Sequence, residues 1–347
     1  MRKIMFMMIS MMLLASCDVH EWPALPEKVA LALKLEYETD MTILEHIYEK
    51  NVITEVGKGE VYDNHQNSGQ IRYIVRTYPI TGKSRSSQSH QQEFVFTKAI
   101  EDGYDHEVML DIIPGEYRIM VWSDLIQNEG DLLMYDASNF FEVTLLGEHS
   151  GSNDYRDAFS ASSDLTVVAD YMEHIPDTLT LKMQRPLAKY EFITDDLQEF
   201  LDEEMAYLSK VAETKGEDAP TRVNTDDYKV VIQYSGYMPN TFNINSDKPI
   251  DSATGVLFES RIDPLNSTEA SIGFDYVFVN GSQAGVSVQV GLYAKSDNRQ
   301  VALSEPIIIP LYRSHHTVLR GSFLTSKASG GLKIDASFDG NHNIVIE

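Results

Sequence analysis

The chain has 347 residues, with 28 Lys and Arg against 53 Asp and Glu, a formal charge of −25, and one cysteine. This acidic balance argues against a nucleic-acid partner, whose phosphates attract basic faces, and against a protein that lies flat on anionic lipid. One cysteine can form neither an internal disulfide nor a thiolate metal cluster. A chain of this length is expected to contain two domains.

The N-terminus has the layout of an export signal. Two basic residues, Arg2 and Lys3, precede an apolar run over residues 4–15, which is short for a membrane-spanning helix of about 20 residues. A basic start, a short apolar run and small residues at its end are typical of a secretory signal peptide.

Leu14, Ala15, Ser16 and Cys17 resemble the lipobox of bacterial lipoproteins. This resemblance implies cleavage just before Cys17 and a lipid on its sulfur. We therefore expect residues 1–16 to be a lipoprotein signal peptide and residues 17–27 to be a lipid-anchored tether, because several acyl chains hold a protein firmly on a bilayer. An ordinary signal peptide with a chance cysteine remains the alternative.

Short strands are predicted along the first half of the chain. Residues 29–38 read VALALKLEYE and alternate between apolar and charged side chains, which indicates a half-buried strand. Residues 71–78 and 117–122 also favour strands, the second after a turn at Pro114-Gly115. Residues 41–50 are interpreted as a short helix.

The second half begins after Pro186, with a strand over residues 188–193 and one long helix over residues 194–211. The helix is predicted from five apolar residues that share one face, and Thr194 is its expected N-cap. Strands with turn residues between them return from Tyr228 onward. The pattern predicts a mainly β protein of two tandem β-sandwich domains, residues 28–185 and 186–347, with one amphipathic helix early in the second.

Motifs of catalysis are missing from the sequence. There is no GxSxG, HExxH or P-loop pattern, so we expect no enzyme, no cofactor and no metal. His315 and His316 are neighbours on a predicted strand and should point to opposite faces. Residues 63–69 faintly resemble a calcium loop that lacks its closing acid, and a polar turn explains them better. Trp22 and Trp122 are assigned to the tether and the core.

Several segments are together similar to the fimbrillins of type V pili. They are LKMQRPLAKYEFIT at 181–194, PGEY running into VWSD at 114–124, IPLYRSHHTVLRGSFLT at 309–325, and GLKI with FDG near the C-terminus. The resemblance implies domains of transthyretin-like, Greek-key type. It also implies export to the outer membrane as a lipid-anchored, surface-exposed protein, and assembly into a fimbrium with other fimbrial subunits by donor-strand exchange.

In the pilus-forming members of that family, a protease removes the first strand after an Arg or Lys. Lys28 and Lys34 are the basic residues in that region here, and Lys34 lies inside the predicted strand. We therefore expect an outer-membrane anchor or accessory subunit that keeps its first strand. The alternative is a surface glycan-binding lipoprotein, which needs an exposed aromatic platform. A secreted hydrolase is the third and least supported class.

Overall fold

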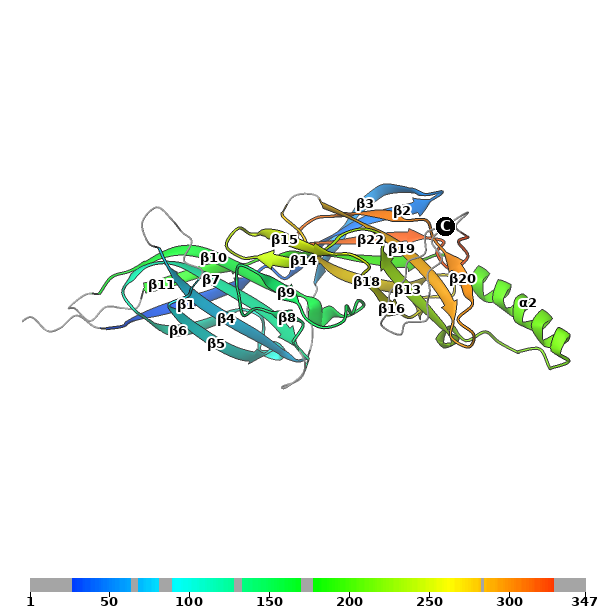
Figure 1. The fold of residues 1–347 in the computed structure, drawn as a ribbon, viewed down its shortest axis with the longest axis horizontal. Helices are drawn as coiled ribbons and strands as arrows, with labels where there is room; N and C mark the ends of the chain where they lie inside the picture. Colours follow the sequence, from blue (N-terminus) through cyan, green and yellow to red (C-terminus); the bar gives the residue numbers. More distant parts are fainter. Residues whose placement is uncertain are drawn as a thin grey trace, which may run out of the picture.

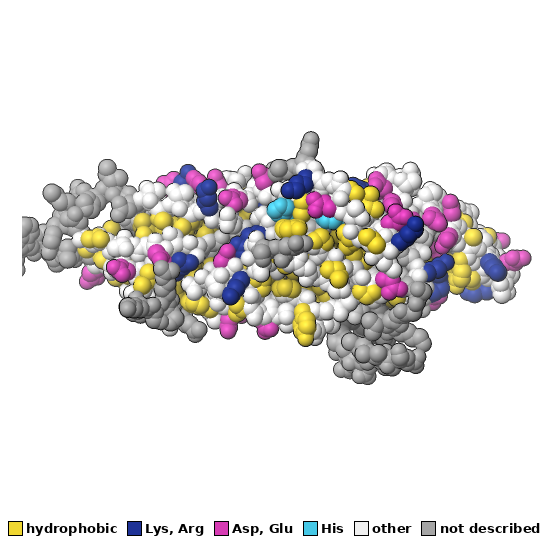
Figure 2. All heavy atoms as spheres, turned by 90° about the horizontal axis from the view of Figure 1, so that it is seen from above, with side chains coloured by type: hydrophobic (Ala, Val, Ile, Leu, Met, Phe, Trp, Pro, Cys, Tyr) yellow, Lys and Arg dark blue, Asp and Glu magenta, His cyan; other side chains and the backbone are white. Residues whose placement is uncertain are grey.

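The computed structural model describes residues 27–63, 68–80, 89–127, 133–169, 177–281 and 284–327. The protein is mainly β, and its strands form two groups placed end to end along the long axis (Figure 1). Charged side chains of both signs are interspersed over the face seen in Figure 2, and hydrophobic side chains gather along its middle.

Two sheets form one group of strands. The first is a three-stranded sheet in the order β11 (Asp177–Met183), β1 (Val29–Tyr37), β6 (His106–Ile112). The second, called the β7 sheet here, has the order β10 (Ala158–Val167), β7 (Gly115–Ile126), β4 (Gln70–Pro79), β5 (Gln92–Ala99).

Two larger sheets form the other group. The six-stranded sheet has the order β17 (Asp263–Pro264), β18 (Ala270–Phe278), β12 (Leu187–Thr194), β22 (His315–Gly321), β2 (Asp40–Glu49), β3 (Val52–Asp63). The five-stranded sheet has the order β16 (Leu257–Ser260), β13 (Tyr228–Tyr234), β19 (Ala284–Ala294), β20 (Gln300–Leu303), and β21 (Ile307–Leu311) also pairs with β19.

A smaller sheet lies between the two groups (Figure 1). Its order is β15 (Lys248–Ala253), β14 (Met238–Asn243), β9 (Val143–Leu145), β8 (Tyr135–Asp136). Among the described residues, the helices are α2 (Leu197–Lys215) and three short 3₁₀ turns, η1 (Ile100–Asp102), η2 (Asp154–Arg156) and η3 (Thr225–Asp227).

Strand β7 carries buried side chains on both faces of its sheet, which explains how the two groups of strands join. Along β7, Ile119 and Val121 pack into the apolar core shared with the three-stranded sheet. Met120 and Trp122, on the opposite face, pack into a second core with residues of the small and six-stranded sheets. Because alternate side chains of one strand enter two cores, β7 links them directly. Trp122 is fully buried, which confirms its predicted core role.

The predicted domain limits, the boundary before Pro186 and the transthyretin-like, Greek-key topology remain predictions. Sheets join strands from both sides of that boundary. β2 and β3 precede it, yet β2 pairs in parallel with β22, which follows it. In the same way β14 pairs with β9.

The prediction of a helix over residues 41–50 is wrong, because this segment is strand β2. Met41 and Leu44 are both buried, and this three-residue spacing resembles a helical face. The cause is that β2 is buried on both faces: Met41 packs into the core that contains Trp122, and Tyr48, on the opposite face, packs into the core between the six- and five-stranded sheets. Burial of Met41 on one face and of Leu44 on the other conceals the period of two.

The long helix is confirmed, but it begins at Leu197, and its cap residue is Asp196. Thr194 is the last residue of β12 and is therefore not the N-cap that the sequence predicted. Asp196 instead accepts hydrogen bonds from the backbone and hydroxyl of Thr325, at 2.8 and 2.7 Å, which ties the helix start to the chain after β22.

Candidate functional site

The predicted lipidation residue Cys17, the lipobox residues Leu14, Ala15 and Ser16, and Trp22 lie outside the described residues and stay predictions. In the described ranges, no helix is long and apolar enough to cross a membrane. Over the same ranges, His, Cys, Asp and Glu side chains nowhere gather in threes that could hold a metal ion.

His315 and His316 point to opposite faces of β22, as their position on a strand predicted. His315 is partly exposed, and its Nδ1 lies 2.6 Å from the carbonyl oxygen of Arg313. His316 is buried, and its Nε2 lies 3.1 Å from Oε2 of Glu191. Residues 64–67 of the calcium-like loop are outside the described part of the chain.

The first candidate site for strand exchange is β1, the first strand of the described chain. It lies in the middle of the three-stranded sheet, with β11 parallel on one side and β6 antiparallel on the other. Leu33, for example, is opposite Leu179 of β11 and Val108 of β6. Backbone groups on both edges of β1 are therefore used in pairing.

The side chains of β1 complete the apolar core of this part of the molecule. Leu31, Leu33 and Leu35 are at most 3% exposed and pack among residues of the β7 sheet, such as Tyr73 and Val121. Burying a leucine side chain stabilises a fold by about 1.5–3 kcal/mol. Removal of β1 would thus open a long apolar groove between β11 and β6.

The two basic residues near β1 differ in their surroundings. Lys28 is exposed and precedes the strand. Lys34 lies inside it, opposite Thr180 and Glu107, and its Nζ is 2.6 Å from Oε1 of Glu36 on the solvent face. Only Lys34 could serve as a cleavage point that cuts β1, and its backbone is paired on both sides.

A buried arginine holds the chain where it crosses from β1 to β2. The guanidinium of Arg185 donates through Nε to both carboxylate oxygens of Asp157, at 2.9 Å each. Its Nη1 donates to the carbonyl oxygens of Glu38 and Asp40, at 3.2 and 3.3 Å. β1 and β2 lie in different groups of strands (Figure 1), so this cation fixes the link between them.

A second buried ion pair is formed by Arg156, the residue that precedes Asp157 in the sequence. Its Nη1 lies 2.6 Å from Oδ1 of Asp275, and neither side chain is more than 2% exposed. The same nitrogen donates to the carbonyl oxygen of Ser150, at 3.2 Å, and lies 2.8 Å from Nε2 of His149. The loop that carries His149 and Ser150 is thereby held against β18.

Asp275 is the centre of a buried polar cluster. Its Oδ2 accepts a hydrogen bond from the hydroxyl of Tyr234 at 2.6 Å, and Tyr190 donates to Tyr234 at 3.1 Å. Burial alone would raise the pKa of Asp275, but Arg156, with His149 and Tyr234, holds this pKa below its ordinary value. Burial and the nearby Asp275 carboxylate raise the pKa of Tyr234 well above its ordinary value. The carboxylate is therefore ionised and fully partnered.

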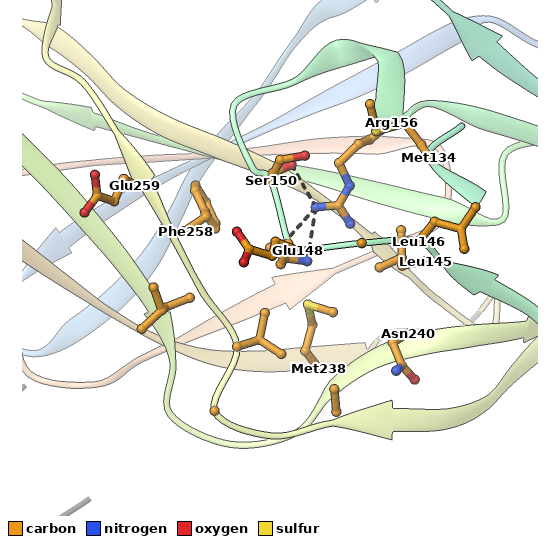
Figure 3. Close-up of a pocket in the computed structure, with 16 residues that line it drawn as sticks. Met134, Leu145, Leu146, Glu148, Ser150, Arg156, Met238, Asn240, Phe258 and Glu259 are labelled. Atoms are coloured by element: carbon orange, nitrogen blue, oxygen red, sulfur yellow. Dashed lines mark hydrogen bonds between the residues drawn. The ribbon is translucent and has the colours of Figure 1, made fainter. Parts of the chain in front are cut away.

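A cavity of about 570 Å³ adjoins this cluster (Figure 3). Its walls come from the loop after β9, from β14 and from β16, and Arg156 reaches its edge from behind the loop. Phe258 and Glu259 lie on one side of the view, and Leu145 and Leu146 lie on the other. The volume is in the range of about 300–1,000 Å³ that is usual for binding pockets.

Sequence reasoning did not single out Arg156, Asp275 or His149. One signal was available, because Asp275 is a charged residue within the apolar strand ASIGFDYVF. Such a residue is almost never buried without a partner, and so it predicts an unknown cation nearby. The identity of that cation, 119 residues away, follows only from the fold.

No curated protein matches the chain. Solved structures that resemble it include the fimbrial anchor protein Mfa2 from Porphyromonas gingivalis, with 10% identity over 79% of this chain and 82% of that one and a TM-score of 0.37. A fimbrial assembly protein from Parabacteroides distasonis has 10% identity, covers 86% and 93%, and has a TM-score of 0.33.

A third structure, from Bacteroides thetaiotaomicron, is described only as a candidate polysaccharide-binding protein. It has 12% identity over 79% of both chains and a TM-score of 0.40. Likenesses this distant assign no function to the chain. The model of a family of unknown function, DUF6562, matches residues 26–347, and the chain belongs to this family.

Proposed function

We propose that the protein is a structural subunit of a surface fimbria, held in the outer membrane by a lipid on Cys17 and joined to other subunits by strand exchange. Within that assembly we assign it the position of the anchor or of an accessory subunit. The observation that carries this assignment is the position of β1, which lies between two partner strands and fills the core with three leucines.

Access of a protease to the backbone of β1 decides whether a subunit keeps its first strand. A protease binds its substrate as an extended chain with free backbone groups, and the backbone around Lys34 is occupied by β11 and β6. Cleavage after Lys28, which is exposed, would leave all of β1 in place. A subunit that keeps β1 cannot receive a donor strand in that groove, which suits one end of a fibre or a side position better than the stalk.

The first test shears surface appendages from cells and immunoblots the sheared and membrane fractions, with and without boiling. We expect a heat-labile ladder whose membrane-bound end contains this protein. The matched variant Cys17→Ala should move the protein from the membrane fraction into the sheared fraction or the medium. A single monomer band in the membrane fraction of the native protein would contradict the fimbrial role.

A second measurement tests whether β1 is kept. Trypsin cuts after Lys28 and Lys34 in the denatured protein, so the peptide VALALK reports directly on this strand. We expect it in the membrane-bound protein in the same amount as peptides from α2. Loss of VALALK from assembled protein would indicate a stalk subunit instead.

The alternative of a glycan-binding lipoprotein needs exposed aromatic rings. Trp122 is unavailable, because it is fully buried and its Nε1 donates to Asp124 at 3.1 Å. Among the described aromatic residues, Tyr237 is 73% exposed and is the better starting point for such a site. A glycan array with no bound ligand would remove this alternative.

A further inference from the structure

The cavity beside Arg156 is bounded by the free edge of a strand. β16 is the terminal strand of the five-stranded sheet, and β13 is its one partner among the described strands. The neighbouring loop approaches it closely at one end, where the hydroxyls of Ser152 and Ser260 are 2.8 Å apart. The rest of the edge faces the cavity, whose lining includes Leu257 and Glu259.

The register of β13 and β16 shows which backbone groups are free. Tyr234 donates its amide to the carbonyl of Val256 at 2.8 Å, and Ile232 is opposite Phe258. In an antiparallel pair, alternate residues exchange hydrogen bonds with the partner, and the residues between them point away from it. The N–H and C=O groups of Leu257 and Glu259 therefore point outward from the sheet. Unpaired strand edges of this kind are templates for a further strand.

The cavity next to this edge is mainly apolar. Its apolar lining comes from Met134, Leu145, Leu146, Met238, Val256 and Phe258. Phe258 is 3% exposed, and its ring is packed against Gly151, so it offers a wall and no free aromatic face. Sugars bind to exposed aromatic faces, whereas a bulky apolar side chain fits a cavity with these walls.

The charges at the cavity favour a basic ligand. Arg156 is neutralised by Asp275 and does not repel a cation. Glu148 is exposed and makes no ion pair with any residue that the structure describes. Glu259 is about half exposed, although it is bound to Lys229 at 2.6 Å. The chain as a whole carries a formal charge of −25, which also attracts a basic partner.

We propose that β16 and this cavity bind an extended segment of a partner protein. The segment pairs with the backbone of Leu257 and Glu259, places one bulky apolar side chain in the cavity, and carries Lys or Arg beside it, near Glu148. Backbone pairing supplies affinity, and the cavity and carboxylate supply specificity. This inference concerns a different edge from β1 and does not depend on the proposed fimbrial role.

The test uses the purified chain and a labelled, end-capped hexapeptide, Thr-Lys-Leu-Lys-Val-Thr, followed by fluorescence anisotropy. We expect saturable binding and slower hydrogen exchange over residues 255–261, because the outward amides of Leu257 and Glu259 gain partners. The same peptide with Glu in place of both Lys should bind more weakly by about two- to fivefold, the usual effect of exposed charge pairs.

Two methylated versions of the peptide test strand pairing itself. Each carries N-methyl groups on the alternate amides of one edge, one version for each edge. A strand pairs with β16 through one edge only, so one version should lose binding and the other should retain it. Equal binding of both versions would overturn the proposal, because the peptide would then be held by its side chains alone.

Variants of the chain test the location. Leu146 is 44% exposed at the cavity, and Leu146→Asp should weaken binding by at least about tenfold, since the apolar contact is lost. Glu148→Gln should remove the preference for the Lys peptide over the Glu peptide. The matched control is Ile308→Asp, on β21 and 71% exposed, which should leave binding unchanged.

Two further results would overturn the proposal. The first is the absence of saturable binding and of exchange protection up to about 1 mM peptide, the affinity of a weak encounter. The second is binding that Leu146→Asp leaves intact, which would place the peptide elsewhere on the chain.

Discussion

Arg156 and Asp157 are neighbours in the sequence, and each forms a buried ion pair with a different residue. The surroundings of the two pairs differ. Asp157 pairs with Arg185 at the crossing from β1 to β2, where neither side chain is more than 1% exposed. Arg156 pairs with Asp275 beside an open cavity. The pair of Asp157 and Arg185 is thus an enclosed joint between two groups of strands. The pair of Arg156 and Asp275 forms part of the wall of a candidate binding site.

The two pairs also differ in which groups contact each charge. Asp157 receives both of its arginine contacts from one nitrogen, Nε of Arg185. Asp275 has Arg156, Tyr234 and His149 around its two oxygens. Arg185 also holds the carbonyl oxygens of Glu38 and Asp40 at the crossing between the two groups of strands, so we expect its removal to cost more than removal of Arg156.

The largest effect is expected for Arg185→Met. Loss of the cation leaves the Asp157 carboxylate buried without the Arg185 counter-charge, and frees the carbonyls of Glu38 and Asp40. Breaking a buried pair from one side costs about 3–5 kcal/mol. The measurement is the free energy of unfolding in urea.

The control for this experiment removes both charges. Arg185→Met combined with Asp157→Leu should recover most of the loss, because two apolar side chains replace the pair. If the single substitution were as stable as the native protein, the crossing would not depend on this joint.

For Arg156→Met we expect a smaller loss of unfolding free energy, about 3 kcal/mol, at the low end of the same range. Asp275 keeps its hydrogen bond from Tyr234 and its contact with His149. The same urea titration compares the two variants directly. A loss equal to that of Arg185→Met would show that the contacts of Arg185 with Glu38 and Asp40 add nothing to stability beyond the ion pair.

The third prediction concerns the packing at the cavity. A Cβ added at Gly151 would lie 2.2 Å from Cε2 of Phe258, so Gly151→Ala must displace the ring or the loop. Overpacking of this kind costs about 1–3 kcal/mol. Gly57→Ala is the control, because nothing lies within 4 Å of its added Cβ. Similar thermal unfolding temperatures for the two variants would contradict the close contact.

The smallest effect is a dependence of stability on pH. The pKa of Asp275 is lowered in the folded protein, so the unfolded chain takes up this proton first as the pH falls. Its contribution is complete above the unfolded pKa of about 3.9 and is lost as the pH falls toward the folded value.

The slope from one such group is at most about 1.4 kcal/mol per pH unit. Asp275→Asn should therefore flatten the loss of unfolding free energy below about pH 5, compared with the native protein. An unchanged slope would show that Asp275 does not contribute to acid sensitivity. The measurement is urea unfolding at a series of acidic pH values.

Local patterns in the sequence determined the strand β1 and the helix α2. Residues 29–38 alternate cleanly, and the strand runs from Val29 to Tyr37. The helical face predicted for residues 194–211 appears in α2, although its start is displaced by three residues. Both elements obey a single period along one uninterrupted segment, which a sequence displays directly.

Strand β2 could not be predicted in this way. It is buried on one face at Met41 and on the other face at Leu44 and Tyr48, and its parallel partner β22 lies far away in the sequence. The pairing of β2 outweighs its local pattern, because a strand is stabilised by its neighbours more than by its own propensity.

The sequence by itself determined a mainly β chain with one long helix, and it placed Trp122 in the core. Only the tertiary structure decided which charges are buried and paired. Arg156 and Asp157 are adjacent and opposite in charge, yet each finds its partner elsewhere, 119 and 28 residues away. The physical reason is that a buried charge is stable only where the fold brings an opposite charge and further hydrogen bonds to it. These partners are distant in the sequence, so no local pattern predicts them.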